Sequence, residues 1–474
     1  MPILALGAWL MFVTWFLVRD VKRRSKVSAA VWIPTILVLM LGSRPVSLWL
    51  SSGGSVIYET GKARLDMGND VAGSPLDQGF FFLILTSSFA VAQSRKVKWA
   101  KLFSNNKIII LFYLYFALSI VWSGDPLGSL KRLIKDFGLL FVISTVFSES
   151  DPLQAVRAVY VRCAAVLLPL SIVFIKYFPN YSRIYDVNGD IQITGVTTQK
   201  NTLGELVLIS MLFLFWDVLE TSLVDGRMRW NRFPWDRVVL LGLGWWLLEL
   251  SKSKTALLCL IIGSVLIVRK GRLASKPISR AMLAGALALP FLLFFSRQFA
   301  SVIAPIVESM GRNMTFTGRA DIWDHITLST VNPLIGAGYW NFWGGPGGFA
   351  INQAMKTTVP NAHDGYLDIY IDGGFVGLFL LFLMLASCGG RIINQLGIKD
   401  RLANRYVLFR FAILIVAICY NLSESQYVRM SMMWFTTLIM LVELPHIART
   451  AKAGHTTAPK ETRAYGPASI YANR

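Results

Sequence analysis

Charged residues are scarce in this chain, and acidic residues are scarcer than basic ones. Of its 474 residues, 16% are charged and 54% are apolar. Soluble domains carry about a quarter charged residues, so low charge combined with long apolar runs is typical of a membrane protein. The apolar runs recur along the whole chain, which excludes a soluble domain held by one anchor.

Cysteine is also rare, and no cysteine stands in a metal or redox motif. The chain lacks a Cys-x-x-Cys pair and any Cys/His spacing that is typical of zinc. Each cysteine lies in an apolar run, so we expect buried structural thiols rather than disulfides or metal ligands. They are Cys163, Cys259, Cys388 and Cys419.

Nucleotide-binding signatures are absent as well. The sequence has no Gly-x-x-x-x-Gly-Lys-Ser/Thr loop and no Gly-x-Gly-x-x-Gly after a strand. It also has no Gly-x-Ser-x-Gly nucleophile elbow. If the protein is an enzyme that acts outside the cytoplasm, its donor substrate must therefore arrive already activated.

The apolar segments predict an all-α, polytopic membrane protein with 12 or 13 transmembrane helices. Several segments are shorter than the roughly 20 residues that a straight span needs, so they extend into their flanks or are partly re-entrant. The segments are 4–18, 29–50, 78–92, 107–122, 133–147, 158–178, 202–219, 237–250, 255–268, 281–296, 374–390, 406–420 and 430–445. We predict four regions: N-terminal transmembrane helices (1–296), a large helical loop between the tenth and eleventh spans (297–372), C-terminal transmembrane helices (373–446) and a disordered cytoplasmic tail (447–474).

The net charge of +20 is distributed in a way that predicts orientation. Basic residues cluster in alternate loops, and the positive-inside rule places such loops in the cytoplasm. The rule therefore explains the charge without nucleic acid as a partner, and it places 297–372 outside, in the periplasm of a Gram-negative cell. With 13 spans the N-terminus lies outside; if 4–18 does not cross, it lies inside.

A few basic residues lie on the outer side against this trend. Lys252 and Lys254 occupy a short outer turn, where an anionic ligand such as a diphosphate and a lipid headgroup are equally good explanations. Lys200 lies where a helix begins, with Asn201 or Thr202 as the expected cap. A helix start beside a lysine is an anion site in principle, although an ordinary capped span is the more common case.

The outer loop itself carries His363. A histidine at a membrane edge is more often structural or solvated than catalytic, but Asp364 or Asp368 beside it would orient the ring and leave one nitrogen free as a base. The Gly- and aromatic-rich run 336–349 has the composition of a surface that stacks sugar rings, although a single aromatic residue is more often an interfacial anchor.

The ordered motifs resemble the O-antigen ligase/O-antigen polymerase superfamily over roughly Gln199 to Glu443. The motifs are Ser253-Lys254-Thr255-Ala256-Leu257-Leu258, Gly318-Arg319-Ala320-Asp321-Ile322-Trp323, Asn-Pro-Leu-Ile-Gly-Ala-Gly at 332–338, and His363-Asp364-Gly365-Tyr366-Leu367. The opening segment, with Ser43-Arg44-Pro45-Val46-Ser47, looks more like the exopolysaccharide-polymerase branch. Two positions depart from the ligase pattern: Lys254 replaces an arginine, which loses bidentate phosphate geometry, and Asp364 replaces an asparagine, which adds a negative charge beside His363.

The resemblance implies a metal-independent, inverting glycosyltransferase in the bacterial inner membrane, with no cofactor. It implies a glycan donor linked to undecaprenyl diphosphate, a glycan or lipid acceptor and surrounding membrane lipids as partners. A polysaccharide assembly complex is a further candidate partner. His363 and Arg319 would be catalytic; Arg319, Lys254, Lys200 and Lys252 would hold the diphosphate; Asp364, Asn361 and Tyr366 would position the acceptor or the base.

Two other functions are compatible with the sequence. A transporter or flippase for a lipid-linked anion would have charges buried in mid-span, and Arg44 and Glu249, the few candidates, lie near predicted helix ends. A non-catalytic subunit of an envelope complex is the third hypothesis. The sequence does not separate a ligase from a polymerase, because both use the same donor.

Overall fold

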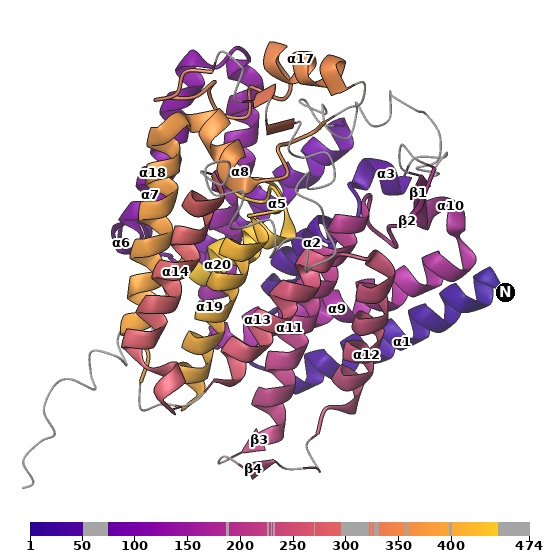
Figure 1. Cartoon of the computed structure of the whole chain (residues 1–474). Helices are drawn as coiled ribbons and strands as arrows, with labels where there is room; N and C mark the ends of the chain where they lie inside the picture. The colour runs from indigo at the N-terminus through magenta and orange to yellow at the C-terminus, as the bar shows by residue number, and fades with distance from the viewer. Residues whose placement is uncertain are drawn as a thin grey trace, which may run out of the picture.

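The protein is an assembly of helices, shown by a computed structural model in Figure 1. The model describes residues 1–50, 74–185, 189–224, 227–228, 230, 233–269, 271–294, 322–323, 325–326, 331–355, 359–397 and 401–443. The helices are, in chain order, α1 (Pro2–Arg23), α2 (Trp32–Leu41), α3 (Val46–Leu50), α5 (Pro75–Ser94), α6 (Trp99–Asn105), α7 (Lys107–Ser119), α8 (Pro126–Phe147), α9 (Pro152–Tyr177), α10 (Pro179–Ser182), α11 (Lys200–Ser222), α12 (Trp235–Ser251), α13 (Lys254–Val268), α14 (Lys276–Phe294), α17 (Pro346–Met355), α18 (Gly365–Asn394), α19 (Arg401–Tyr420) and α20 (Met432–Leu441).

Extended structure is limited to two short hairpins among the described residues. Strands β1 (Arg183–Tyr185) and β2 (Ile191–Ile193) pair antiparallel, and so do β3 (Leu223–Val224) and β4 (Arg227–Met228). Single 3₁₀ turns precede α2 (Ala29–Val31), follow α7 (Ile120–Trp122) and precede α14 (Gly271–Ala274).

The all-α, polytopic class predicted from the sequence is confirmed. Within the described residues, five helices are long and apolar enough to cross a membrane, namely α1, α5, α9, α11 and α18. The pair α6 and α7, bent by 93°, makes a sixth if it is one span. Each predicted apolar segment overlaps one of the helices, and the number of complete crossings remains a prediction.

The most buried helices lie in the middle of the bundle. In the apolar window of α11, 83% of residues are buried, against 11% in α1, which packs on α9 at the edge of the molecule (Figure 1). Aromatic rings fill the interior: Tyr160 stacks on Phe213 with 3.7 Å between ring centroids, and Trp216 on Phe409 with 4.3 Å. All four cysteines are free. Cys163, Cys259 and Cys388 are buried, as expected, and Cys419 is half-buried.

Helix α18 is broken at Gly374, whose φ of +62° and ψ of −161° suit only glycine. The break leaves backbone groups without helical partners, and residues 333–338 supply them. Ala337 N donates to Ile371 O at 2.8 Å and Phe375 N donates to Pro333 O at 2.9 Å. Gly336 lies so close that an added Cβ would be 2.6 Å from the Asp372 backbone. The predicted boundary at 372/373 thus falls just before this break, and α18 already begins inside the predicted loop.

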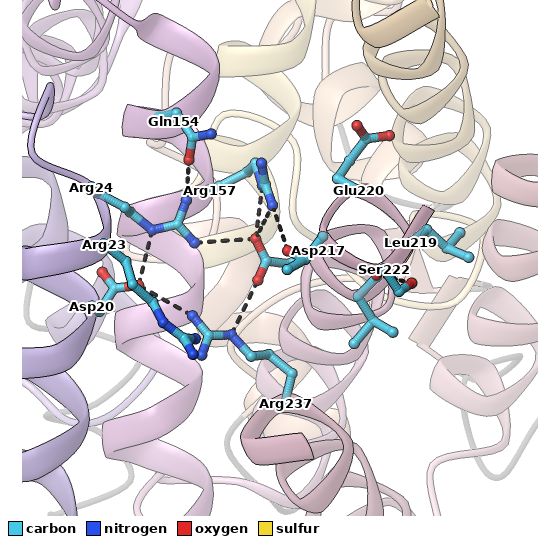
Figure 2. A network of polar contacts seen from close by, with 12 residues as sticks. Asp20, Arg23, Arg24, Gln154, Arg157, Asp217, Leu219, Glu220, Ser222 and Arg237 are labelled. Carbon is cyan, nitrogen blue, oxygen red and sulfur yellow. Dashed lines mark hydrogen bonds and ion pairs between the residues drawn. The ribbon is translucent and has the colours of Figure 1, made fainter. Parts of the chain in front are cut away.

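A group of buried ion pairs, here called the arginine clamp, joins the ends of four helices (Figure 2). Asp20 of α1 accepts from Arg24 at 2.9 Å and from Arg162 of α9 at 2.9 Å. Asp217 of α11 contacts Arg157 of α9 at 2.6 Å. Arg237 of α12 contacts both carboxylates, at 3.3 and 3.2 Å. The clamp fixes α1, α9, α11 and α12 to one another on the side predicted to be cytoplasmic.

Candidate functional site

The candidate site is built around the loop 421–431, which connects α19 to α20. The Asn421 side chain shapes this loop: its Oδ1 accepts from Gln426 N at 2.9 Å and Tyr427 N at 3.0 Å, and its Nδ2 donates to Ala417 O at 2.8 Å. Gly365 N donates to Asn421 O at 2.8 Å. An added Cβ on Gly365 would lie 2.2 Å from Asn421 Oδ1, so only glycine permits this contact.

Four helices begin beside this loop. Tyr420 OH donates to the backbone oxygen of Asn201, which ties the start of α11 to it at 3.2 Å. The Thr255 hydroxyl at the start of α13 hydrogen-bonds Ser423 Oγ at 2.7 Å. Gly365 begins α18, and Ser431 caps α20 by accepting from Trp434 N at 3.1 Å. Helix starts carry unpaired N–H groups and positive partial charge, so this end of the bundle favours anions, although α19 ends here and contributes the opposite partial charge.

His363 faces a carboxylate of this loop. Its Nδ1 lies 3.8 Å from Glu424 Oε2, and Asn201 Nδ2 donates to the other oxygen of Glu424 at 2.8 Å. His363 adopts a φ of +52°, and its backbone N–H donates to Asn361 Oδ1 at 3.0 Å. Nδ1 is buried and has no hydrogen-bond partner among the described residues, while a quarter of the side chain remains exposed. The imidazole is therefore held in an unusual backbone conformation beside Glu424.

The two aspartates expected to orient the imidazole accept hydrogen bonds from other groups. Asp364 caps α18, with its Oδ1 accepting from Tyr366 N at 2.8 Å and Leu367 N at 3.1 Å. Asp368 Oδ1 accepts from Ala362 N at 3.1 Å and Trp343 Nε1 at 2.8 Å. The carboxylate that faces His363 is Glu424, which the sequence reasoning missed, and the orienting role expected of Asp364 stays a prediction. The available signal was an acidic residue in a short outer loop between two apolar segments.

Tyr366 is also placed differently from the expectation. Its hydroxyl is 2.9 Å from Ile418 O and 3.1 Å from Tyr427 OH, inside the core. The residue is buried, so it anchors the start of α18 rather than facing the space beside His363. Asn361, by contrast, holds the His363 backbone and keeps a place in the site.

The lysines of the predicted diphosphate site lie at two neighbouring helix starts. Lys200 is the first residue of α11 and Lys254 the first residue of α13, after the Ser253 cap. Gly204 allows these helices to approach closely, since a Cβ there would be 2.7 Å from Ser253 Cβ. Lys252 is exposed at the end of α12 with a φ of +51°. The structure thus brings Lys200 and Lys254 to the loop that holds Glu424, through Asn201 and Thr255.

Two other expectations on these residues have different outcomes. Asn201 does not cap α11, which begins one residue earlier, because its side chain donates to Glu424 instead. Arg319, predicted to be catalytic and to bind the diphosphate, lies outside the described residues. Trp323, four positions later in the sequence, donates from Nε1 to Ala362 O at 2.9 Å, next to His363.

The aromatic residues of 336–349 mostly point inward. Trp343 is 6% exposed and bonds Asp368, while Trp340 donates to Val428 O at 3.0 Å. Arg429 lies over the Trp340 ring at 3.9 Å and contacts Asp372 at 3.2 Å and Asp368 at 3.4 Å. Burial alone would lower the pKa of Arg429, but the carboxylates of Asp372 and Asp368 raise it above its ordinary value, so it stays charged. Trp340 and Trp343 therefore hold the run 336–349 in place and are not free to stack on sugar rings.

Arg44 organises the segment that leads into Lys200. This buried guanidinium donates to Val196 O at 3.2 Å and Thr197 O at 3.2 Å, and also to Tyr181 O and Gly195 O. Because it donates to backbone oxygens of four residues, Arg44 fixes the path of 195–197 just before α11. Arg44 of the Ser-Arg-Pro-Val-Ser motif thereby holds the segment that leads into Lys200.

A comparison with known proteins finds two similarities. Residues 238–382 match the O-antigen ligase family. The chain is thus similar to O-antigen ligases over less than half of its length. It is also 24% identical over 313 residues to the exopolysaccharide production protein ExoQ of Rhizobium meliloti (strain 1021), an alignment that covers 64% of this chain and 68% of that protein. The resemblance found from the motifs is confirmed.

The matched segment, 238–382, spans only part of the candidate site. The match includes Lys254 and His363 and leaves out Lys200, Asn201 and Glu424. Within the described residues, no three His, Cys, Asp or Glu side chains are grouped closely enough to hold a metal ion. The described part of the site offers an imidazole–carboxylate pair beside cationic helix starts.

Proposed function

We propose that the protein is an inverting, metal-independent glycosyltransferase. It moves a glycan from undecaprenyl diphosphate to a hydroxyl acceptor on the periplasmic side of the inner membrane, and so polymerises or ligates exopolysaccharide or O-antigen units. The match to the O-antigen ligase family and the similarity to an exopolysaccharide production protein support the substrate class. The observation that carries the proposal is the meeting of the His363–Glu424 pair with two lysine-bearing helix starts at one loop.

The donor's diphosphate is the dense anion that these helix starts would bind. Lys254, Lys200 and Lys252 lie at or near the starts of α11 and α13, and Arg319 completes the proposed set. As the bond between the anomeric carbon and the phosphate oxygen breaks, negative charge grows on the leaving group. Fixed cations and N–H dipoles stabilise this charge in the transition state.

His363 would act on the acceptor. It takes the proton from the acceptor hydroxyl while the oxygen bonds to the anomeric carbon and undecaprenyl diphosphate leaves; the proton then passes to solvent. One displacement inverts the anomeric configuration. With Nδ1 facing Glu424, the other ring nitrogen is the one left for the acceptor, and the carboxylate stabilises the imidazolium that forms.

Purified full-length protein assayed with a lipid-linked glycan tests this scheme. The His363→Ala variant should lose transfer, whereas His325→Ala should keep it, because His325 is an exposed histidine of the same sequence interval. Full transfer by the His363→Ala protein would remove histidine from the mechanism. In cells lacking the gene, single repeat units without polymer indicate a polymerase, and polymer that stays unattached indicates a ligase.

A transporter is the second candidate, since charged residues are buried within helices. Glu205 and Arg410 are examples, at 3% and 1% exposure. Each has a structural partner: Glu205 accepts from Met433 N at 2.7 Å, and Arg410 donates to Met440 O at 2.7 Å. These contacts favour packing over a transport path. Net flux of substrate without covalent change in proteoliposomes would favour transport instead.

A further inference from the structure

The arginine clamp holds more positive than negative charge. Among the described residues, its ion pairs join six guanidiniums to three carboxylates. The guanidiniums are those of Arg19, Arg23, Arg24, Arg157, Arg162 and Arg237, and the carboxylates are those of Asp20, Asp217 and Asp236. The two central carboxylates are 1% exposed and fully engaged (Figure 2). The excess positive charge must therefore be neutralised by groups outside the clamp.

The surplus lies on the outer surface of α1. Arg19 and Arg23 both lie 3.7 Å from the same oxygen of Asp236, which Arg237 also contacts. At 3.7 Å neither makes a hydrogen bond of normal length. Their side chains are 43% and 41% exposed. One carboxylate oxygen thus serves three guanidiniums, and two of these remain open to the surroundings.

These two arginines border a groove of about 490 Å³. It is lined by Thr14, Trp15, Val18, Arg19, Lys22 and Arg23, which lie on one face of α1 because they recur at three- and four-residue steps. Its upstream end is apolar and its downstream end basic. Arg19 lies over the Trp15 ring at 5.1 Å, at the boundary between the two.

The apolar end of the groove continues along α1 toward the N-terminus. Leu10 and Met11 are 57% and 70% exposed, and α1 packs on α9 at the edge of the bundle (Figure 1). In a membrane protein such a face is covered by acyl chains. A basic patch at the end of a lipid-facing helix is the arrangement that attracts anionic headgroups, with long basic side chains reaching into the interface.

We propose that this groove binds one phospholipid with an anionic headgroup. The phosphate lies among the Arg19, Lys22 and Arg23 side chains, and an acyl chain runs past Val18 and Trp15 along α1. Charge complementarity selects the anionic lipid, because a zwitterionic headgroup would bring its own cation to a site that already has a surplus. The site lies on the outer face of α1, beside the arginine clamp and apart from the loop 421–431, so it does not depend on the proposed glycosyl transfer.

Native mass spectrometry of the full-length protein in detergent tests the proposal, with phosphatidylglycerol and phosphatidylcholine of identical chains as probes. The wild type should retain one phosphatidylglycerol and release phosphatidylcholine. The double variant Arg19→Gln/Arg23→Gln should bind phosphatidylglycerol roughly thirty-fold more weakly, since each basic residue near an anionic lipid contributes about a factor of five. Trp15→Ala should weaken retention of phosphatidylglycerol, because it removes the ring beside the acyl chain, and phosphatidylcholine should still be released.

The matched control is Lys98→Gln/Lys101→Gln, which removes two exposed basic residues near α6, on the side predicted to be cytoplasmic, and should leave binding unchanged. The double variant should fold, because Arg24, Arg162 and Arg237 keep the clamp closed, and its thermal unfolding checks this. Equal retention of phosphatidylcholine, equal loss in the control, or displacement of the lipid by inorganic phosphate would overturn the proposal. Loss of a dimer, rather than of lipid, in the double variant would also overturn it and make the groove an interface between copies.

Discussion

Glu424 offers the sharpest test of the site, because Glu424→Gln removes charge and little else. The glutamine keeps the length of the side chain, and its oxygen still accepts from Asn201 Nδ2. What disappears is the attraction between the carboxylate and an imidazolium at His363, whose Nδ1 lies 3.8 Å away. Any loss of activity therefore reports on charge that develops during the reaction.

The size of the loss follows from the distance and the burial. At about 4 Å, two unit charges attract by about 4 kcal/mol with an effective dielectric constant of about 20, and by about 1 kcal/mol in water. Glu424 has 8% of its side chain exposed, so its attraction to the imidazolium should be close to the buried value of about 4 kcal/mol. A quarter of the His363 side chain is exposed, which lowers the attraction toward the value in water. We expect kcat to fall about a hundred-fold, equivalent to about 2.7 kcal/mol.

The assay is steady-state transfer from a lipid-linked glycan by purified protein, with kcat and KM measured separately. The KM for the donor should hardly change, because the proposed diphosphate site consists of the lysines and helix starts rather than Glu424. Glu424→Asp should recover part of the activity, since it restores the charge at a longer distance. If Glu424→Gln transfers within twofold of the wild type, the carboxylate has no part in the proton transfer and the pairing with His363 is only structural.

Three further changes test the surrounding structure. Gly365→Ala should unfold the end of α18 at the site and lower Tm by several degrees, because its Cβ would lie 2.2 Å from Asn421 Oδ1. Gly390→Ala in the same helix should be neutral or stabilising, because its Cβ would have no atom within 4 Å. Asp217→Asn should lower the free energy of unfolding, measured with denaturant, by about 3–5 kcal/mol, because it leaves three guanidiniums short of a partner. Asp151→Asn should lower it little, because asparagine is also a good helix cap. Arg44→Gln should raise the donor KM more than it lowers kcat, because it releases residues 195–197 before Lys200; an unchanged KM would limit Arg44 to a packing role.

The sequence predicted the charged members of the site better than their arrangement. Lys254 stood out because basic charge on the outer side needs a reason, Lys200 because it lies at a helix start, and His363 because of its neighbours and the resemblance. The structure brings their segments to one loop. Glu424 was missed because a lone acidic residue in a short loop has no spacing that marks it. Its role depends on Asn201, which is 223 positions away in the chain.

Features that depend on long-range backbone hydrogen bonds could not be predicted from the sequence either. The break at Gly374 is sealed by residues 333–338, and this pairing requires positive φ at Gly336 and Gly374. Hydropathy places a span over 374–390 but contains no information on such long-range hydrogen bonds. The positive-inside rule likewise explained Arg24 and its neighbours as markers of orientation and could not reveal that they share buried aspartates.

Helix α11 connects the arginine clamp to the candidate site but holds the two far apart. Asn201 and Asp217 both belong to α11, and at 1.5 Å per residue they lie about 24 Å apart along its axis. A change in the clamp can therefore reach the site only by loosening the packing of α11, which lowers the fraction of folded protein without altering the chemistry of the rest. Asp217→Asn should then lower the amount of active enzyme on heating but leave kcat per folded molecule unchanged. A lowered kcat in fully folded protein would mean that α11 transmits a change between its ends.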